Sequence, residues 1–167
     1  RRVRSSRTIP ARSRRDLGAI SARRYSAFRA WANSTWALAR PLVVLAGRTG
    51  TGKTDVLRAL ANDCGAQMLD LEGLAEHRGS SFGALGMPSQ PTNQQFENML
   101  ALRWASFSPS EPVYIEDESR SVGKCGVPDG LWARMRAADA TVLRLEVPDT
   151  TRVDRLVGEY GAYSPSA

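Results

Sequence analysis

Histidine and cysteine are scarce in this 167-residue sequence, and long apolar runs are missing. There is one histidine, His77, and the two cysteines, Cys64 and Cys125, lie far apart and match no metal-ligand spacing. We therefore expect reduced, inert thiols and neither a disulfide framework nor a zinc site. No apolar stretch approaches the roughly 18 residues that cross a bilayer, and the opening residues lack the apolar core of a secretory signal. We expect a cytoplasmic protein without a membrane anchor, with an organelle transit peptide as the alternative.

Acidic residues are nearly absent from the first forty positions. Residues 1–40 hold eleven arginines against the single acid Asp16, a net charge of +10, so the overall +6 leaves −4 for residues 41–167. Arginine and serine offer little apolar surface to bury, and we expect residues 1–22 to form a disordered arm. A basic arm of this kind suits contacts with nucleic-acid phosphates.

Short apolar runs alternate with amphipathic segments through the rest of the chain. Runs such as "PLVVLA" predict strands, and "TNQQFENMLALRWASF", with a capping-box threonine at its start, predicts a helix. Such alternation is typical of βαβ units, so we expect an α/β fold with a mainly parallel sheet flanked by helices. Strands are predicted at 41–46, 66–71, 112–117 and 141–148, and helices at 23–40, 54–64, 92–107, 128–138 and 149–160.

The stretch "GRTGTGKT" fits the P-loop pattern G-x-x-x-x-G-K-T, also called Walker A, without a mismatch. It follows a predicted strand and precedes a predicted helix, which is the context that the motif requires. Its glycines let several backbone N–H groups face a phosphate, and the helix N-terminus adds partial positive charge at the same point. A P-loop NTPase-like core over residues 41–167 follows, with a phosphate site formed by Gly47, Arg48, Thr49, Gly50, Thr51, Gly52, Lys53 and Thr54.

Acidic side chains follow the strand predicted at 112–117. Glu116 and Asp117 end this strand, so they are expected at the same sheet edge as the P-loop. A carboxylate there can hold Mg²⁺ through water, and we expect Thr54 and Asp117 to be its ligands. Arg120, close behind, is either a phosphate clamp or a partner of these acids. A surface acid cluster without a ligand is the alternative.

The stretch "DLEGLAEHRGSSFGALG", residues 70–86, is expected to be a flexible loop after the second strand, above the phosphate site. Asp70 and Glu72 are predicted at the rim of the site, with His77 and Arg78 further out. The histidine suits proton transfer or anion binding, and the arginine suits phosphate. The alternative is a solvated loop without a role.

Several of these stretches together resemble one family. "VLAGRTGTGKTDVLRAL", "LDLEGLAEHRGSSFGALG", "QPTNQQFENMLA", "VYIEDESRSVG", "LWARMR" and "LEVPDTTRVDRLVGEY" are similar, in this order and spacing, to the P-loop part of the tRNA 2-selenouridine synthase family, and cover roughly residues 42–160. The resemblance implies a transferase of wobble 2-thiouridine in tRNA. It implies as polar site residues Lys53, Thr54, Asp70, Glu72, His77, Arg78, Ser80, Ser81, Glu116, Asp117, Ser119 and Arg120.

The implied reaction has two steps with two phosphate-bearing substrates. Members of the family first attach a geranyl group from geranyl diphosphate to the sulfur, and then replace it with selenium from selenophosphate. Both substrates give the P-loop a use that does not require ATP hydrolysis. The expected partners are therefore tRNA and these small molecules; no further cofactor is expected beyond Mg²⁺, and nothing in the sequence indicates an oligomeric state.

The sequence departs from the family pattern at both ends. The family begins with a rhodanese-like domain that carries a reactive cysteine, and residues 23–40 resemble only the final helix of that domain. The family also continues into a helical region, so residues 41–167 look C-terminally truncated. Neither cysteine matches the reactive one, and selenation is therefore not expected of this chain alone, whereas the motifs for geranyl transfer are present.

Two other functions are compatible with the same residues. In a P-loop small-molecule kinase, Lys53 and Thr54 would bind ATP and Asp70 would orient an acceptor hydroxyl. In a non-catalytic remnant, the chain would bind tRNA without modifying it. ATP consumption in the presence of an acceptor would identify the first, and binding of tRNA without any change in its nucleosides would identify the second.

Overall fold

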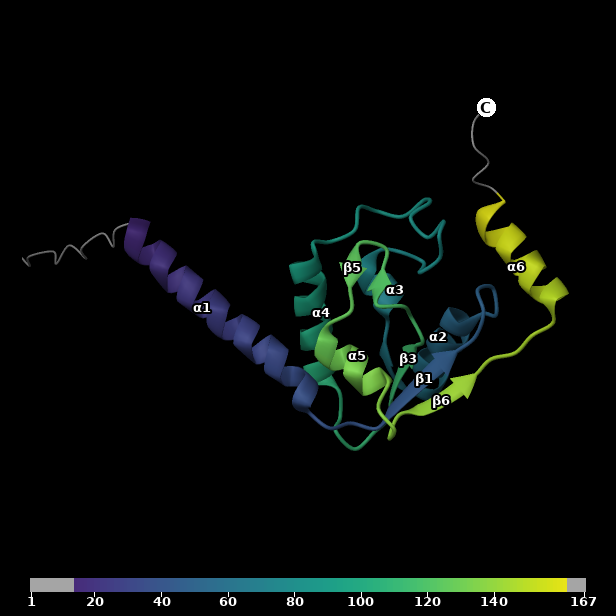
Figure 1. Ribbon diagram of the computed structural model, residues 1–167, viewed down its shortest axis with the longest axis horizontal. Helices are drawn as coiled ribbons and strands as arrows, with labels where there is room; N and C mark the ends of the chain where they lie inside the picture. Colours follow the sequence, from purple (N-terminus) through teal and green to yellow (C-terminus); the bar gives the residue numbers. More distant parts are fainter. Residues whose placement is uncertain (1–13, 162–167) are drawn as a thin grey trace, which may run out of the picture. The chain divides into compact units, whose positions relative to one another are not determined.

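The computed structural model describes residues 14–161 and divides into two units, residues 1–31 and 32–167. Helix α1 (Arg14–Ser34) occupies most of the first unit (Figure 1). Residues 14–22, which the sequence analysis placed in the arm, belong to this helix, and leucine, alanine and arginine favour a helix. The remainder of the predicted arm lies outside the described residues.

The predicted helix over 23–40 ends earlier than the sequence indicates. α1 stops at Ser34, and Thr35–Ala37 forms a 3₁₀ turn, η1, before Pro41. The ring centres of Phe28 and Trp31 lie 5.4 Å apart, and Trp31 is 39% exposed, whereas Trp36 of η1 is buried.

The second unit is built on a parallel sheet of four strands, as predicted. The strands are β1 (Leu42–Ala46), β2 (Gln67–Leu69), β3 (Val113–Glu116) and β6 (Thr141–Arg144), in the order β2-β3-β1-β6. All three neighbouring pairs are parallel. The expected α/β class, with a P-loop NTPase-like core, is confirmed.

Alternation of side chains along the strands creates two cores, one on each face of the sheet. On one face, Val44 and Ile115 pack with buried residues of α4 (Asn93–Ser106) and α5 (Asp129–Met135). On the other, Leu45 and Met68 pack against Leu57 of α2 (Lys53–Cys64). Figure 1 shows these helices around the sheet. Since successive strand residues point to opposite faces, one short apolar run supplies both cores.

Three short elements and one helix surround the carboxyl edge of the sheet. Helix α3 (Leu71–Ala75) lies within the stretch expected to be a flexible loop, and β4 (Ser121–Val122) and β5 (Cys125–Gly126) form an antiparallel hairpin that the sequence did not predict. Helix α6 (Asp149–Tyr160) follows β6. Among residues 14–161, no helix is long and apolar enough to span a membrane.

Candidate phosphate and carboxylate site

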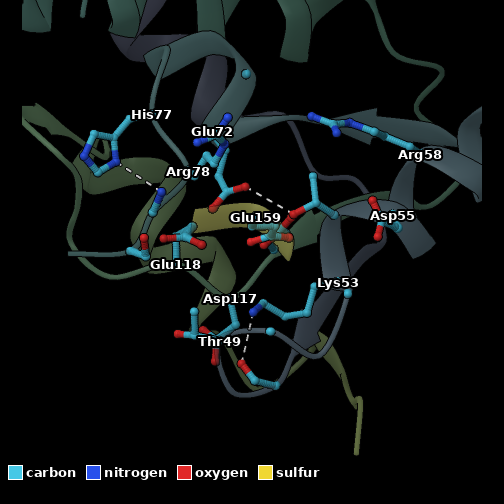
Figure 2. Close-up of a pocket in the computed structure, with 18 of the residues that line it drawn as sticks. Thr49, Lys53, Asp55, Arg58, Glu72, His77, Arg78, Asp117, Glu118 and Glu159 are labelled. Carbon is cyan, nitrogen blue, oxygen red and sulfur yellow. Dashed lines mark hydrogen bonds between the residues drawn. The ribbon is translucent and has the colours of Figure 1, made fainter. Parts of the chain in front are cut away.

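The carboxyl ends of β1, β2 and β3 open into one cavity of about 540 Å³ (Figure 2). The P-loop follows β1, α3 follows β2, and an acidic segment follows β3, so each strand delivers one wall. Parallel strands place all their carboxyl ends at the same edge, which is where ligands of open α/β sheets bind. The fold therefore brings together the motifs that the sequence left up to about 70 residues apart.

The P-loop has the backbone that its glycines allow. Gly50 and Gly52 adopt φ angles of 80° and 82°, a left-handed conformation that other residues rarely take. Lys53 opens α2, and its Nζ donates to the Gly47 carbonyl at 3.1 Å, across the mouth of the loop (Figure 2). The ammonium group is thus held over the concave side of the loop, where a phosphate would accept its hydrogen bonds.

Six of the eight predicted phosphate-site residues line the cavity, and two have other positions. Thr51 is buried, and its hydroxyl donates to the Arg48 carbonyl at 2.8 Å, which closes the turn. Arg48 is exposed and pairs with Asp149 at 3.3 Å. The six that line the cavity are Gly47, Thr49, Gly50, Gly52, Lys53 and Thr54.

Helix α6 packs against the outside of the P-loop. Arg152 Nε donates to the Thr49 carbonyl at 3.0 Å, and Arg155 is paired with Asp55 of α2. A Cβ placed on Gly52 would lie 2.9 Å from the Arg155 guanidinium carbon. Two arginines of the last described helix therefore brace the loop, an arrangement that sequence motifs did not indicate.

Three glutamates form the opposite wall of the cavity. One carboxylate oxygen from each of Glu72, Glu116 and Glu118 lies within 4.8 Å of the others. The Thr54 hydroxyl donates to Glu72 Oε2 at 3.1 Å, and Glu116 Oε1 is buried without a hydrogen-bond partner among the described residues. Figure 2 shows the Glu72 and Glu118 side chains facing the same space above Lys53. We refer to these three residues as the carboxylate cluster.

Burial and mutual repulsion raise the pKa values of this cluster. For Glu72 the pKa rises to about 8, first because burial disfavours the charged form and then because Glu116 and Glu118 lie close. Burial also raises the pKa of Glu116, against the opposing effect of Thr54 and Lys53, and it raises that of Glu118. Three carboxyl groups are therefore gathered in a partly buried place where their ionisation costs free energy, as is common at functional sites.

A divalent cation fits this arrangement. Carboxylate and hydroxyl oxygens are the donors that Mg²⁺ prefers, and a buried oxygen without a partner is an open acceptor. The residues that would hold the ion are Thr54 and the carboxylate cluster. Asp117, which the sequence analysis favoured, also lines the cavity, but its carboxylate bonds Arg136 at 2.5 Å.

Asp117 points away from its two neighbours at a tight turn that follows β3. The Glu118 amide donates to the Glu116 carbonyl at 2.9 Å, so the chain bends around Asp117 and does not continue as a strand. Glu116 and Glu118 join the cluster, while the side chain between them reaches Arg136 just beyond α5. Glu118 was missed in the sequence analysis, although the run "EDE" at a strand end carried the signal.

The stretch over residues 70–86 is ordered by local hydrogen bonds. Asp70 caps α3, its Oδ1 accepting from the Gly73 amide at 2.8 Å, and its other oxygen lies 3.9 Å from Arg58. His77 is buried, and its Nδ1 accepts from the Gly79 amide at 3.1 Å. Asp70 does not line the cavity. The His77 ring does line it, and the same ring supports the turn at Gly79.

Arg78 and Ser80 connect this stretch to α6. Arg78 donates to the Leu85 carbonyl at 2.9 Å and lies 6.0 Å from the centre of the Tyr160 ring. The hydroxyls of Ser80 and Tyr160 are hydrogen-bonded at 2.8 Å. The stretch over residues 70–86 thus contacts the helix that braces the P-loop, and both Arg78 and Ser80 line the cavity.

The side chains of the remaining predicted residues are bonded to other partners or lie outside the cavity. Ser119 lines the cavity, but its hydroxyl donates to the Ser121 carbonyl at 2.5 Å. Arg120 pairs with Asp129 and lies 5.4 Å from the Trp132 ring centre, so it faces α5. Ser81 is exposed at a neighbouring pocket. Lining residues that the sequence analysis did not select include Arg58, Met87, Glu118, Glu159 and Tyr160.

Both cysteines are free and lie outside the cavity lining. Cys64 is exposed at the end of α2, and Cys125 is buried in β5, where burial raises the pKa of its thiol. A buried thiol with a raised pKa is a poor nucleophile. The expectation that the thiols are free is confirmed, and neither lies at the cavity.

Comparisons with known proteins agree with the motif assignment. The tRNA 2-selenouridine synthase of Nitrosomonas eutropha is 38% identical over 127 residues, covering 74% of this chain and 31% of that protein. The enzyme of the same name from Pseudomonas syringae pv. tomato is 46% identical over 121 residues, covering 71% and 31%. The chain thus spans about a third of the length of these relatives.

Among solved structures, a gluconokinase from Sinorhizobium meliloti 1021 is similar with a TM-score of 0.40 and 20% identity, covering 75% of this chain and 69% of that one. The family model described as the tRNA 2-selenouridine synthase AAA domain matches residues 40–164. This match spans the sheet, the P-loop, the carboxylate cluster and α6. The chain therefore belongs to the family of the tRNA 2-selenouridine synthase AAA domain.

Proposed function

We propose that this chain is the diphosphate-binding part of a transferase that modifies wobble 2-thiouridine in tRNA, with geranyl diphosphate as the donor. The observation that carries the proposal is the P-loop cavity, in which Lys53 faces the carboxylate cluster across a space for phosphate. The relatives bear the name of an enzyme that acts on tRNA.

In the proposed reaction, the sulfur of 2-thiouridine attacks the first carbon of the geranyl group. A carbon–sulfur bond forms, the bond from that carbon to the diphosphate oxygen breaks, and the N3 proton of the base passes to water. Lys53 and the P-loop amides stabilise the negative charge that develops on the leaving diphosphate. Mg²⁺, when bound, supplies further charge neutralisation, and the residues that would hold it are Thr54 and the carboxylate cluster.

Selenophosphate, the second substrate implied by the resemblance, has the phosphate group that the same cavity accepts. Replacement of the S-geranyl group by selenium uses a cysteine that the resemblance places in a rhodanese-like domain. Neither Cys64 nor Cys125 lines the cavity. The proposal therefore assigns geranyl transfer to this chain and no selenium chemistry.

The test is nucleoside mass spectrometry of tRNA that contains 2-thiouridine, after incubation with this chain, geranyl diphosphate and Mg²⁺. We expect the mass of S-geranyl-2-thiouridine to appear, and Lys53→Ala to abolish it, because the terminal phosphates lose their cation. Lys124→Ala is the matched control, since the only other lysine is exposed on the β4–β5 turn. Full activity of Lys53→Ala would refute the role of the P-loop.

Two other outcomes would replace the proposal. ATP consumption that depends on a small acceptor would indicate a kinase. Tight tRNA binding with unmodified 2-thiouridine under turnover conditions would indicate a binding remnant. Both are measured in the same preparation, so that a misfolded sample, which would bind neither tRNA nor diphosphate, is recognised.

A further inference from the structure

A second cavity, of about 710 Å³, adjoins the phosphate cavity. Its walls are the stretch 79–82, the edge of the P-loop and one face of α6. Thr49, Gly79, Ser80 and Tyr160 line both cavities, so the two spaces meet along these residues. A ligand seated in one can therefore extend into the other. We call the second space the α6 pocket.

The two cavities have opposite chemical character. The phosphate cavity is lined by nine Asp, Glu, Lys and Arg residues, whereas no described residue that lines the α6 pocket is charged. Phe82, Val153 and Val157 are 63%, 56% and 63% exposed there, and Leu156 completes the wall. Large apolar side chains gathered in a concave place are typical of ligand sites.

The walls of the α6 pocket are held in place by contacts at both of its sides. The Ser80–Tyr160 hydrogen bond of 2.8 Å and the Phe82–Tyr160 ring contact of 6.2 Å join the stretch 79–82 to α6. On the other side, a Cβ placed on Gly50 would lie 3.0 Å from Leu156 Cγ, so helix and P-loop are in close contact. The pocket is therefore formed before a ligand arrives.

From this juxtaposition we infer that the α6 pocket binds the hydrocarbon chain of a substrate whose phosphate groups lie in the P-loop. The inference rests on the proposed function. It adds the pocket that holds the hydrocarbon chain of the substrate and the residues that select that hydrocarbon chain. A polar occupant such as a nucleobase fits less well, because its edges need hydrogen-bond partners. Two of the hydroxyls in the lining, those of Ser80 and Tyr160, already bond each other.

The gain in affinity follows from the apolar area that the hydrocarbon chain of the substrate would bury. Each buried methylene contributes about 0.8 kcal/mol, which corresponds to roughly fourfold in affinity. Burial of only two additional carbons therefore gives more than tenfold. A ten-carbon diphosphate should bind at least ten times more tightly than a five-carbon one, and inorganic diphosphate should bind no better than the latter.

Calorimetric titration of this chain with three probes tests the inference: inorganic diphosphate, dimethylallyl diphosphate and geranyl diphosphate. The double variant Val153→Ser/Val157→Ser should lose at least fivefold in affinity for geranyl diphosphate and keep its affinity for inorganic diphosphate. Serine and valine have similar helix propensities, and both valines are exposed, so the fold is retained. The control is Val142→Ser/Leu143→Ser, which changes similarly exposed apolar residues on β6.

Equal affinities for the three diphosphates would overturn the inference and leave the proposed phosphate site standing. The inference would also be overturned if ATP bound more tightly than geranyl diphosphate and if the double variant lost affinity for ATP. A nucleobase would then occupy the pocket. If no diphosphate binds, and Lys53→Ala behaves as the unchanged chain does, the proposed function fails as well. If the double variant and the β6 control lose equally, the effect does not come from the α6 pocket and the inference fails.

Discussion

Replacing Glu72 with glutamine should make the protein more stable at alkaline pH. The pKa of this carboxyl is raised from 4.5 to about 8 in the folded chain, so the charged form is disfavoured by folding. A group whose pKa is raised by folding stabilises the folded state while it is protonated, and that contribution is lost as the pH rises from about 4.5 through about 8. Glutamine keeps an oxygen that can accept from Thr54 and carries no charge at any pH.

The magnitude follows from the shift and from the exposure of the site. At about 1.4 kcal/mol per pKa unit, a rise from 4.5 to about 8 corresponds to about 5 kcal/mol in full. Glu72 is only half-buried, and its repulsion is shared with two neighbouring carboxylates, so we reduce this value by at least half, to about 2 kcal/mol. Between pH 6 and pH 9 the folded state loses rather more than half of this contribution to the free energy of unfolding, about 1 kcal/mol.

The assay is urea unfolding at pH 6, 7, 8 and 9 with a chelator present, so that no divalent cation binds the cluster. The unchanged chain should lose about 1 kcal/mol more of its free energy of unfolding over this range than Glu72→Gln does. Glu159→Gln, at an exposed glutamate that lines the same cavity, is the control for loss of one negative charge. Parallel pH profiles for the unchanged chain and Glu72→Gln would refute the explanation of the raised pKa.

Four further predictions concern the same region. Mg²⁺ affinity, measured by calorimetry, should rise from pH 6 to pH 9, because the ion must displace the proton that the raised pKa of Glu72 retains; an unchanged affinity would exclude this carboxyl as a ligand. Gly79→Ala should lower the free energy of unfolding by more than about 1 kcal/mol, since φ is +68° and the new Cβ would lie 2.5 Å from Glu72 Oε1. Thr92→Ala should cost about 1 kcal/mol through loss of the α4 cap, and an unaltered denaturation midpoint would contradict that role. Gln90→Ala should cost about 2 kcal/mol and speed amide exchange around β4, as measured by mass spectrometry.

The local parts of the fold were predictable from the sequence. The strand at β1, the P-loop and the start of α2 are adjacent in the chain, and apolar periodicity and glycine spacing are local signals. The parallel sheet followed from alternation of strands and helices. By contrast, the five-residue helix α3 is too short to show a periodic pattern. The helix over residues 14–22 was not predicted, because their arginine-rich composition is typical of disordered segments.

The candidate site was only partly predictable, because several positions depend on contacts between distant segments. His77 is buried because Gly83 and Gly123 allow its ring to pack closely, and nothing near it in the sequence indicates this. The bracing of the P-loop by Arg152 joins residues about a hundred positions apart. The position of Glu118 in the cluster depends on the turn that its amide closes with the Glu116 carbonyl, although its place in an acidic run at a strand end indicated the same edge of the sheet.

The side chain of Gln90 has a consequence for the thermodynamics of binding. Its amide nitrogen donates to the Ala75 and Val122 carbonyls at 2.9 Å, and its oxygen accepts from the Lys124 amide at 2.8 Å. One residue thus ties the end of α3 to the β4–β5 hairpin, at the base of the stretch that lines both cavities. The conformational entropy of that stretch is therefore lost when the chain folds, and ligand binding does not have to compensate for it again.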